Sequence, residues 1–385
     1  MKVFIAIDSF KGSLSSRDAG AAVSEGIKAV YPNAKTLVGV LADGGEGTVR
    51  AIVGATDGCF EKASVHDPLG RPITAEYGVI GGTKTAVMEM AEASGITLLG
   101  DGERNPLETS TFGFGEMLCD AIGKGYRDFV IGIGGSATND GGFGMLRALG
   151  FEFYDEKGAP VSLGAKGLRS LARIETENNM ALLAECRFTV ACDVKNPLCG
   201  ENGCSAVFGP QKGASPNMVK EMDGWLSRYA ALTEKAIGKD FSSHEGSGAA
   251  GGLGFAFLAY LNASLCSGAE TVMKAVSLEE KIRKADILVT GEGRLDRQSF
   301  MGKAPVEAAK IAKKYGKSVI AFSGAVSDSL ADTSDLQGER FIDAFFPIVG
   351  KPCALTEAMD KEHARKNMSR TAEQAFRLWK AAERR

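Results

Sequence analysis

The residues with the clearest chemical potential in this chain are carboxylates that directly follow short apolar segments. A carboxylate at the end of a buried parallel strand lies at the sheet edge where ligands bind. Such groups can hold a hard cation together with substrate phosphates, or orient an alcohol and accept its proton during phosphoryl transfer. A single Asp in this position is more often a helix cap or turn former, but seven carboxylates at such positions favour a common role in metal binding or phosphoryl transfer. The set is Asp8, Asp43, Glu46, Asp140, Asp193, Glu292 and Asp296.

The segment 128–144, DFVIGIGGSATNDGGFG, joins an apolar run to a loop of small and polar residues. Glycines in such a loop let the main chain approach an anion closely, and its N–H groups can bind phosphate. Residues 132–137 also match the dinucleotide pattern G-x-G-x-x-A, with Glu152 or Asp155 placed to bind a ribose. However, residues 138–142 continue the loop where a dinucleotide fold would already be helical. The chain has no Walker A motif.

Further loops contain groups that could contact an anion. Lys11 lies in the first loop, where its ammonium could reach an anion at a helix start, although a solvated lysine is an equal reading. Lys195, Lys212 and Lys303 are open to the same two readings, and Arg71 could bind a carboxylate or be exposed. The segment 247–254 predicts either an anion-binding helix start or glycines that permit close packing.

Composition is typical of a cytoplasmic enzyme. The formal net charge is -3 with 24% charged residues, so electrostatics do not favour nucleic acid or an anionic membrane. The first residues, MKVFIAIDSF, are too short an apolar stretch for a signal peptide, and no apolar run could span a bilayer. The 8 cysteines therefore predict thiols, and the scattered histidines disfavour zinc.

Strand-like and helical patterns alternate along the chain, which predicts parallel α/β sheets. A length of 385 residues favours two domains. The turn cluster at 66–72 and the segment 281–286 suggest the boundaries. We therefore expect a discontinuous Rossmann-like α/β domain (1–66 plus 283–385) and an inserted α/β domain (67–282). The expected strands are 3–7, 37–41, 129–133, 188–192, 287–290, 319–322 and 344–346; residues 16–30 and 356–385 are expected to be helical.

Several of these strings together resemble the type I family of bacterial glycerate kinases. They are DSFKGSLSS from Asp8, ADGGEGT from Ala42, GIGGSATNDGGFGML from Gly132, CDVKNPLCGENG from Cys192, VFGPQKGA from Val207, GAAGGLGFA from Gly248 and TGEGRLDRQSFMGKAP from Thr290. The resemblance extends to about residue 350. It implies two parallel-sheet-containing α/β domains, one inserted into the other, with an interdomain active-site cleft. It also implies ATP- and Mg2+-dependent phosphorylation of D-glycerate, most often at the 2-hydroxyl and in some members at the 3-hydroxyl.

The family name does not say which acid plays which role, and we predict the roles of individual residues as a hypothesis. Asp193 accepts the proton of the glycerate hydroxyl, and Lys11 assists catalysis while holding the substrate carboxylate. Further glycerate contacts come from Asp8, Ser9, Ser13, Arg71, Lys195 and Asn196. The nucleotide is bound by Gly134, Gly135, Ser136, Thr138, Asn139, Gly251 and Gly252. Magnesium is held by Asp43, Glu46 and Asp296.

Three other classes remain open from the sequence. The match at 132–137 allows a nicotinamide-dependent oxidoreductase. A two-domain solute-binding protein and a metal-dependent phosphatase would use similar loops. The sequence does not determine which hydroxyl is phosphorylated or whether the chain forms a homo-oligomer.

Overall fold

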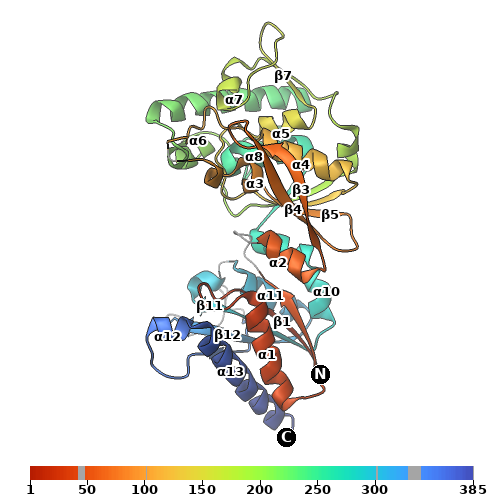
Figure 1. Cartoon of the computed structure of the whole chain (residues 1–385), viewed down its shortest axis with the longest axis vertical. Helices are drawn as coiled ribbons and strands as arrows, with labels where there is room; N and C mark the ends of the chain where they lie inside the picture. The colour runs from red at the N-terminus through yellow and green to blue at the C-terminus, as the bar shows by residue number, and fades with distance from the viewer. Residues whose placement is uncertain (42–47, 101, 301, 328–339, 385) are drawn as a thin grey trace. The chain divides into compact units, whose positions relative to one another are not determined.

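The computed structural model describes residues 1–41, 48–100, 102–300, 302–327 and 340–384, and the chain divides into two compact units. Unit 1 comprises Met1–Gly44 and Val272–Arg385, and unit 2 comprises Gly45–Thr271. The fold is α/β, as expected, and unit 1 is discontinuous in sequence (Figure 1). Within the described residues, no helix combines the length and apolar character needed to cross a membrane.

Unit 1 contains a parallel sheet with helices on both faces. Its described strands have the order β13-β12-β11-β1-β2, and every pairing is parallel. Numbered within the unit, this is the order 2-1-3-4-5 of doubly wound folds, which reverses at β1. The elements are β1 Lys2–Ile7, α1 Ser16–Val30, β2 Lys35–Val40, α10 Leu278–Arg283, β11 Ile287–Leu295, α11 Ala304–Lys314, β12 Ser318–Val326, β13 Ala344–Pro347, α12 Leu355–Met359 and α13 Lys361–Ala382.

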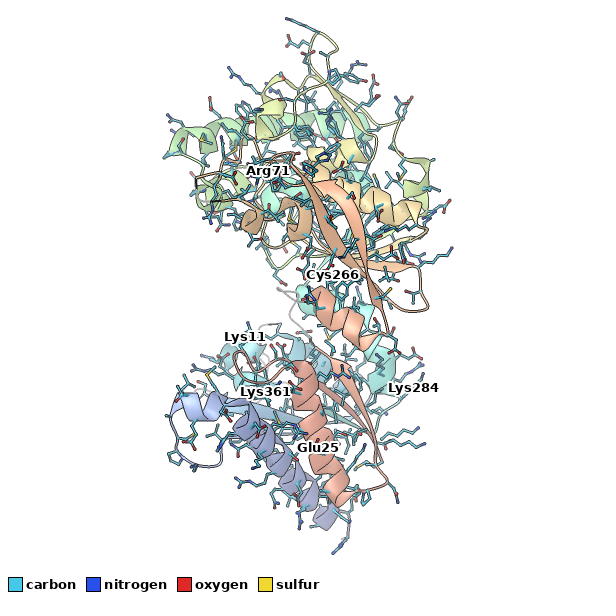
Figure 2. All side chains as sticks on the ribbon, in the orientation of Figure 1. Lys11, Glu25, Arg71, Cys266, Lys284 and Lys361 are labelled. Carbon is cyan, nitrogen blue, oxygen red and sulfur yellow. The ribbon has the colours of Figure 1, made fainter. Side chains whose placement is uncertain are left out.

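The core of unit 1 explains the helical periodicity of its sequence. Ser15 caps α1 by accepting a hydrogen bond from the Asp18 N–H at 3.1 Å, as its position predicted. The apolar face of α1 packs with α13 over β1 (Figure 1). Ion pairs Lys361–Asp18 and Arg365–Glu25 join the exposed sides of these helices. Figure 2 labels Lys361 and Glu25. The helix α11 contacts β1, β11 and β12, so the central strands are covered on both sides.

Unit 2 contains a mixed sheet of described strands in the order β10-β9-β6-β5-β4-β3, together with the small β7-β8 pair. The pairings from β10 to β5 are parallel, and β4 and β3 are added antiparallel. The strands are β3 Cys59–His66, β4 Pro72–Val79, β5 Thr85–Glu89, β6 Asp128–Gly132, β7 Glu152–Tyr154, β8 Arg173–Glu175, β9 Arg187–Ala191 and β10 Ser264–Cys266. The helices are α2 Thr48–Ala55, α3 Ala91–Ser94, α4 Phe112–Gly123, α5 Phe143–Ala148, α6 Cys204–Phe208, α7 Pro216–Ile237, α8 Ala249–Leu261 and α9 Gly268–Ala275, which extends into unit 1.

The unit boundaries fall at 44/45 and 271/272, whereas the sequence suggested 66/67 and 282/283. The reason lies in the turn cluster at 66–72, which forms the tip of the β3–β4 hairpin. There the Asp67 N–H donates to the Arg71 carbonyl at 2.8 Å, and Gly70 adopts φ 83°. The turn therefore reverses the chain within one sheet. The helix α2 and the strand β3 belong with unit 2 because they pack against β4.

Candidate active site

Unit 1 contains a cavity of about 810 Å3 at the carboxyl ends of its central strands, called here the unit 1 cavity. Its polar lining comes from the loop after β1, from the end of β11 and from Lys303 before α11. This is the point where the strand order reverses, and ligands of doubly wound sheets bind at that position. Lys11 is exposed in the loop between β1 and α1 (Figure 2). The polar lining residues are Asp8, Ser9, Lys11, Ser13, Glu292, Arg294 and Lys303.

The backbone around this cavity is tightly packed. The Asp8 N–H donates to the Gly291 carbonyl at 2.9 Å, which holds the end of β1 against β11. Gly12 has φ 77°, and a Cβ there would lie 2.6 Å from the Met359 Cε of α12. A Cβ on Gly324 would lie 2.6 Å from the Gly293 carbonyl oxygen. Glycine is therefore required where loop and strand ends meet.

The most buried carboxylate of the unit 1 cavity is Glu292, which is 6% exposed. Its Oε2 accepts from the Lys303 Nζ at 3.0 Å, while its Oε1 is buried without a hydrogen-bond partner among the described residues. The Ser13 Oγ is also buried without a partner in that part of the chain. Two cavity-lining polar groups thus lack a partner in the described part of the protein, which is costly unless a ligand or water binds them. The sequence predicted Glu292 just beyond a strand that ends at residue 290, whereas β11 continues through Glu292 to Leu295. The sequence contained no signal for the pairing of Glu292 with Lys303.

Asp296, predicted to hold metal, follows the end of β11 and begins the 3-10 turn Arg297–Phe300. Its Oδ1 accepts from the Ser299 N–H at 3.3 Å, and its own N–H donates to the Ser299 Oγ at 3.1 Å. Asp43 and Glu46 lie outside the described residues. Across the described ranges, no group of three or more His, Cys, Asp or Glu residues could hold a metal ion.

In unit 2, the 132–142 loop follows β6, as its sequence predicted, and α5 begins only at Phe143. Gly134 and Gly135 are exposed, whereas Ser136, Thr138 and Asn139 are buried. The loop is held by the Ile96 N–H, which donates to the Gly135 carbonyl at 2.8 Å, and by further bonds to residues 94 and 109. The part of this loop that a ligand could reach is therefore the Gly134–Gly135 backbone. The late start of α5 also distinguishes this loop from a dinucleotide-binding turn, in which the helix begins at the glycine motif itself.

Lys212 holds the loop from inside the protein. Its side chain is almost fully buried, at 2% exposure, and its Nζ donates to the Thr138 carbonyl at 2.6 Å and to the Ser136 Oγ at 3.2 Å. Burial lowers the pKa of Lys212 to about 8, although the nearby Cys204 and Asp140 oppose part of this change. An almost inaccessible ammonium that bonds two loop oxygens is a positioning group rather than a ligand contact.

Asp140 stabilises the same loop from its other end. It is fully buried, and its carboxylate accepts from the Thr111 N–H at 2.9 Å and from the Gly142 N–H at 3.1 Å. Burial raises the pKa of Asp140, while these bonds and those from the Thr111 and Ser110 hydroxyls act in the opposite direction. Asp140 was one of the carboxylates noted at strand ends, and it serves here as a structural acceptor.

The 248–254 segment packs directly on the 132–142 loop. The Gly141 N–H donates to the Gly251 carbonyl at 2.9 Å, and a Cβ on Gly251 would lie 2.0 Å from the Thr138 carbonyl oxygen. Gly251 and Gly252 are buried and have φ 68° and 90°. Of the two interpretations of this segment, close backbone packing is the one its geometry supports.

Asp193 and its neighbours follow β9 in unit 2. Asp193 is exposed, and its Oδ1 accepts from the Gly268 N–H at 3.0 Å at the start of α9. The Lys195 Nζ lies 3.2 Å from the Glu245 Oε2, and both side chains are largely exposed. The Asn196 Nδ2 donates to the Asn202 carbonyl at 2.8 Å. The carboxylate of Asp193 is accessible to a ligand.

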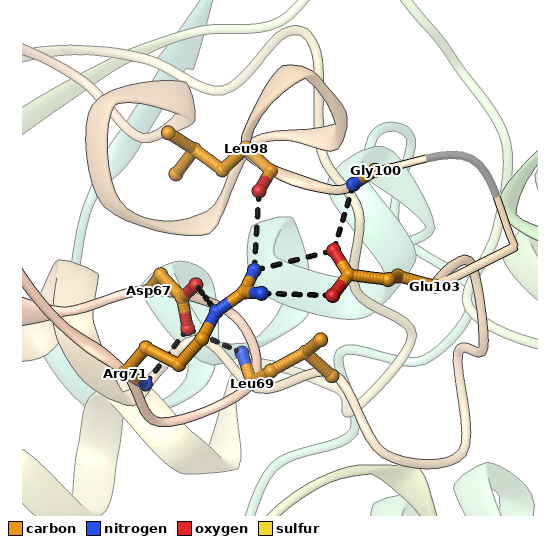
Figure 3. A network of polar contacts seen from close by, with 6 residues as sticks. All are labelled: Asp67, Leu69, Arg71, Leu98, Gly100 and Glu103. Atoms are coloured by element: carbon orange, nitrogen blue, oxygen red, sulfur yellow. Dashed lines mark hydrogen bonds and ion pairs between the residues drawn. The ribbon is translucent and has the colours of Figure 1, made fainter.

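Arg71 is engaged by the protein itself (Figure 3). Its Nε donates to the Asp67 Oδ2 at 2.5 Å and its Nη1 to the Glu103 Oε1 at 2.8 Å, while its Nη2 reaches the Leu98 carbonyl at 3.3 Å. Burial disfavours the charged form of Asp67, but hydrogen bonds from Arg71 and Leu69 lower its pKa overall. The guanidinium thus joins the β3–β4 turn to the 98–103 segment.

Comparison with known proteins identifies the family of this chain. The model of the glycerate kinase family matches residues 3–380. A Bacillus subtilis glycerate kinase is 45% identical over 372 residues, covering 97% of this chain and 96% of that protein. An Escherichia coli K12 protein named glycerate 2-kinase is 44% identical, covering 93% of each chain.

A solved structure supports the same assignment. A crystal structure from Salmonella typhimurium LT2, described as a candidate glycerate kinase 2, has a TM-score of 0.87 and is 41% identical, covering 100% of each chain. The fold, the family match and these relatives agree, and the chain belongs to the glycerate kinase family.

Proposed function

We propose that this enzyme transfers the γ-phosphoryl group of ATP to the 2-hydroxyl of D-glycerate, giving 2-phosphoglycerate and ADP. The observation that carries the proposal is the family match over residues 3–380. The 2-position is favoured by the name of the E. coli relative, which is 44% identical to this chain. The exposed Gly134–Gly135 backbone at the end of β6 supports a role in binding an anionic donor.

The unit 2 residues suit the phosphoryl donor and the reacting hydroxyl. The backbone of Gly134 and Gly135 binds the phosphates. Buried residues pack behind this backbone and hold it in place; they are Ser136, Thr138, Asn139, Gly251 and Gly252. Asp193 orients the glycerate hydroxyl and accepts its proton, because a loose transition state depends more on orientation than on basicity. Lys195 and Asn196 follow Asp193 and contact the acceptor. The proposal omits Arg71, whose donors already bind Asp67, Glu103 and Leu98.

The unit 1 residues suit a small carboxylic acid. Lys11 neutralises the glycerate carboxylate and assists catalysis, and Ser13, Ser9 and Asp8 complete its contacts at the polar end of the unit 1 cavity. The Ser13 hydroxyl, which has no partner among the described residues, supports this, since it can donate a hydrogen bond to a carboxylate oxygen.

Magnesium fits the donor chemistry, because this ion is bound through one or two carboxylates together with substrate phosphates. Asp296, which lies in the described part of the chain, would bind the magnesium ion, and Asp43 and Glu46 are the other carboxylates proposed to bind it. When bound, the ion would neutralise charge on the phosphates.

The direct test measures ADP release with and without D-glycerate, and phosphorus NMR identifies the product. ADP release that depends on glycerate, with a 2-phosphate resonance, is the expected result. A 3-phosphate would move the transfer to the other hydroxyl, whereas glycerate-independent release would indicate hydrolysis. Binding and oxidation of NADH would instead favour an oxidoreductase.

A variant test addresses the role of Gly134. A Cβ at Gly134 meets no atom within 4 Å, so Gly134→Ala should leave the fold intact. If phosphate lies against this backbone, the KM for ATP should rise about tenfold or more, because a charge-assisted hydrogen bond contributes roughly 1.5–3 kcal/mol. Gly224→Ala is the matched control, since its Cβ also meets open space but lies on α7. An unchanged KM for ATP in Gly134→Ala would remove this loop from the proposed site.

A further inference from the structure

The unit 1 cavity is larger and more apolar than a small hydroxy acid requires. Its volume of about 810 Å3 lies within the range of about 300–1,000 Å3 that is typical of sites for drug-sized ligands. Glycerate carries an oxygen on every carbon, so an apolar wall offers it little. The wall nevertheless forms much of the cavity, and it comprises Phe10, Val326, Ile348, Val349, Leu355, Ala358, Met359 and Ala364.

This wall is assembled by several elements of unit 1. Val326 ends β12, Ile348 and Val349 follow β13, and α12 adds Ala358 and Met359. The Ile348 N–H donates to the Ser323 carbonyl at 2.8 Å, which fixes the segment after β13 on the sheet. An apolar surface held in place at a ligand-binding edge is suited to a flat, weakly polar group.

The polar side of the cavity indicates what that group is attached to. Glu292 is 6% exposed, and its Oε1 has no partner among the described residues, so the site lacks a hydrogen-bond donor there. Glu292 lies within β11, three residues before the carboxyl end of the strand, and a carboxylate near that end of a parallel strand commonly binds ribose hydroxyls in nucleotide-binding sheets. A nucleoside offers both features, because its base has apolar faces and its ribose has hydroxyl donors.

We propose that the unit 1 cavity binds the nucleoside part of the phosphoryl donor. The adenine base lies against the apolar wall, and a ribose hydroxyl donates to Glu292. This inference rests on the proposed use of ATP, and it assigns sites to the adenine base and the ribose. Lys303 orients Glu292 as an acceptor, through the 3.0 Å contact with its Oε2.

A free thiol inside the cavity allows a test on the unaltered protein. Cys353 lines the unit 1 cavity and is a free, half-buried cysteine, whereas Cys59 is an exposed cysteine of unit 2. The full chain is treated with iodoacetamide, and alkylation of each cysteine is followed by peptide mass spectrometry. Adenosine at about ten times its Kd should slow alkylation of Cys353 about tenfold, since protection follows occupancy. The rate at Cys59 should not change, and D-glycerate alone should not protect Cys353.

A variant gives the kinetic counterpart. Ala358→Phe fills the apolar wall, while Ala381→Phe makes the same change at an exposed position of α13 outside the cavity. Ala358→Phe should raise the KM for ATP about tenfold and abolish inhibition by adenosine, while inhibition by tripolyphosphate and the KM for glycerate stay within about twofold. Ala381→Phe should match the wild type in all four.

The outcomes separate this inference from the proposed function. Protection of Cys353 by D-glycerate but not by adenosine, or by neither, overturns the inference while leaving a glycerate kinase. Protection by adenosine without glycerate-dependent ADP release supports the nucleoside site and refutes the proposed reaction. If Ala358→Phe does not fold, the thiol measurement on the wild type decides alone.

Discussion

Replacing Lys212 with Met should change how the stability of unit 2 depends on pH. The Lys212 Nζ is buried and bonds the Thr138 carbonyl and the Ser136 Oγ. Burial lowers its pKa from 10.5 to about 8. Between these values the unfolded chain binds the proton and the folded chain does not. The free energy of unfolding therefore rises with pH across this window.

The size of the effect follows from the two pKa values. Raising the pH from about 7.5 to about 9.5 should add about 2 kcal/mol to the unfolding free energy of the wild type through Lys212 alone. Lys212→Met lacks this gain. At the lower pH its lost bonds cost about 1–3 kcal/mol each, and removal of a desolvated charge offsets part of that cost. The difference between wild type and variant should therefore grow by about 2 kcal/mol as the pH rises.

The two tryptophans make this measurement specific for unit 2. Trp225 lies in α7 of unit 2 and Trp379 in α13 of unit 1. In a Trp379→Phe background, fluorescence during urea unfolding reports on unit 2. Titrating groups that do not interact with Lys212 are the same in both proteins and cancel in the comparison. Equal pH dependence in the wild type and in Lys212→Met would refute the account of a desolvated ammonium.

Three further changes test other parts of the site. Asp193→Asn should lower kcat at least about 100-fold without altering stability, as measured by steady-state kinetics and thermal unfolding; near-normal turnover would exclude Asp193 as the proton acceptor. Ser13→Ala removes a buried hydroxyl that has no partner in the described chain, so unfolding should be unchanged while the KM for glycerate rises about fivefold or more. Gly251→Ala places a Cβ 2.0 Å from the Thr138 carbonyl oxygen at φ 68°, and should destabilise unit 2 by about 3 kcal/mol or more. Gly224→Ala should instead stabilise α7 by about 0.5–1 kcal/mol, and a similar loss in both glycine variants would contradict the packing argument.

Central strands were predictable from the sequence because burial on both faces makes them continuous apolar runs. The runs at 3–7, 129–133 and 319–322 correspond to β1, β6 and β12, with ends shifted by up to four residues. The helix at 356–385 was also predicted, but it is broken at Asp360, which caps α13 by accepting from the His363 N–H at 2.9 Å. A local side-chain bond of this kind ends one helix and starts another without changing the apolar pattern.

The edge strands of unit 2 were missed for the opposite reason. Along β3 only Ala63 and Val65 are buried, and polar residues alternate with them. One exposed face gives a short period-2 pattern that polar loops can imitate. With β3 and β4 unrecognised, the turn at 66–72 was interpreted as the exit from a domain rather than as the tip of a hairpin.

Contacts between residues distant in sequence set the roles of individual lysines. Lys212 and Lys303 had the same two readings as Lys11 and Lys195, because lysine is ordinarily exposed. Lys212 is buried since its acceptors, Ser136 and Thr138, lie more than 70 residues earlier, with separations of 76 and 74. The sequence contains no local pattern for such a pairing, so the burial of Lys212 could not be predicted.

The arrangement of the 132–142 loop gives its unusual composition a physical explanation. Its polar side chains face inward, where Lys212 and Asp140 bond the loop at successive points, and Gly251 packs against it from below. The exposed groups are the glycines, which have no side chain to hold them in place. Rigid backbone donors stabilise a developing negative charge without reorganising during the reaction. The buried residues of the motif therefore fix the backbone of Gly134 and Gly135, and under the proposed phosphate-binding role of this backbone their replacement should impair nucleotide binding without removing a direct contact.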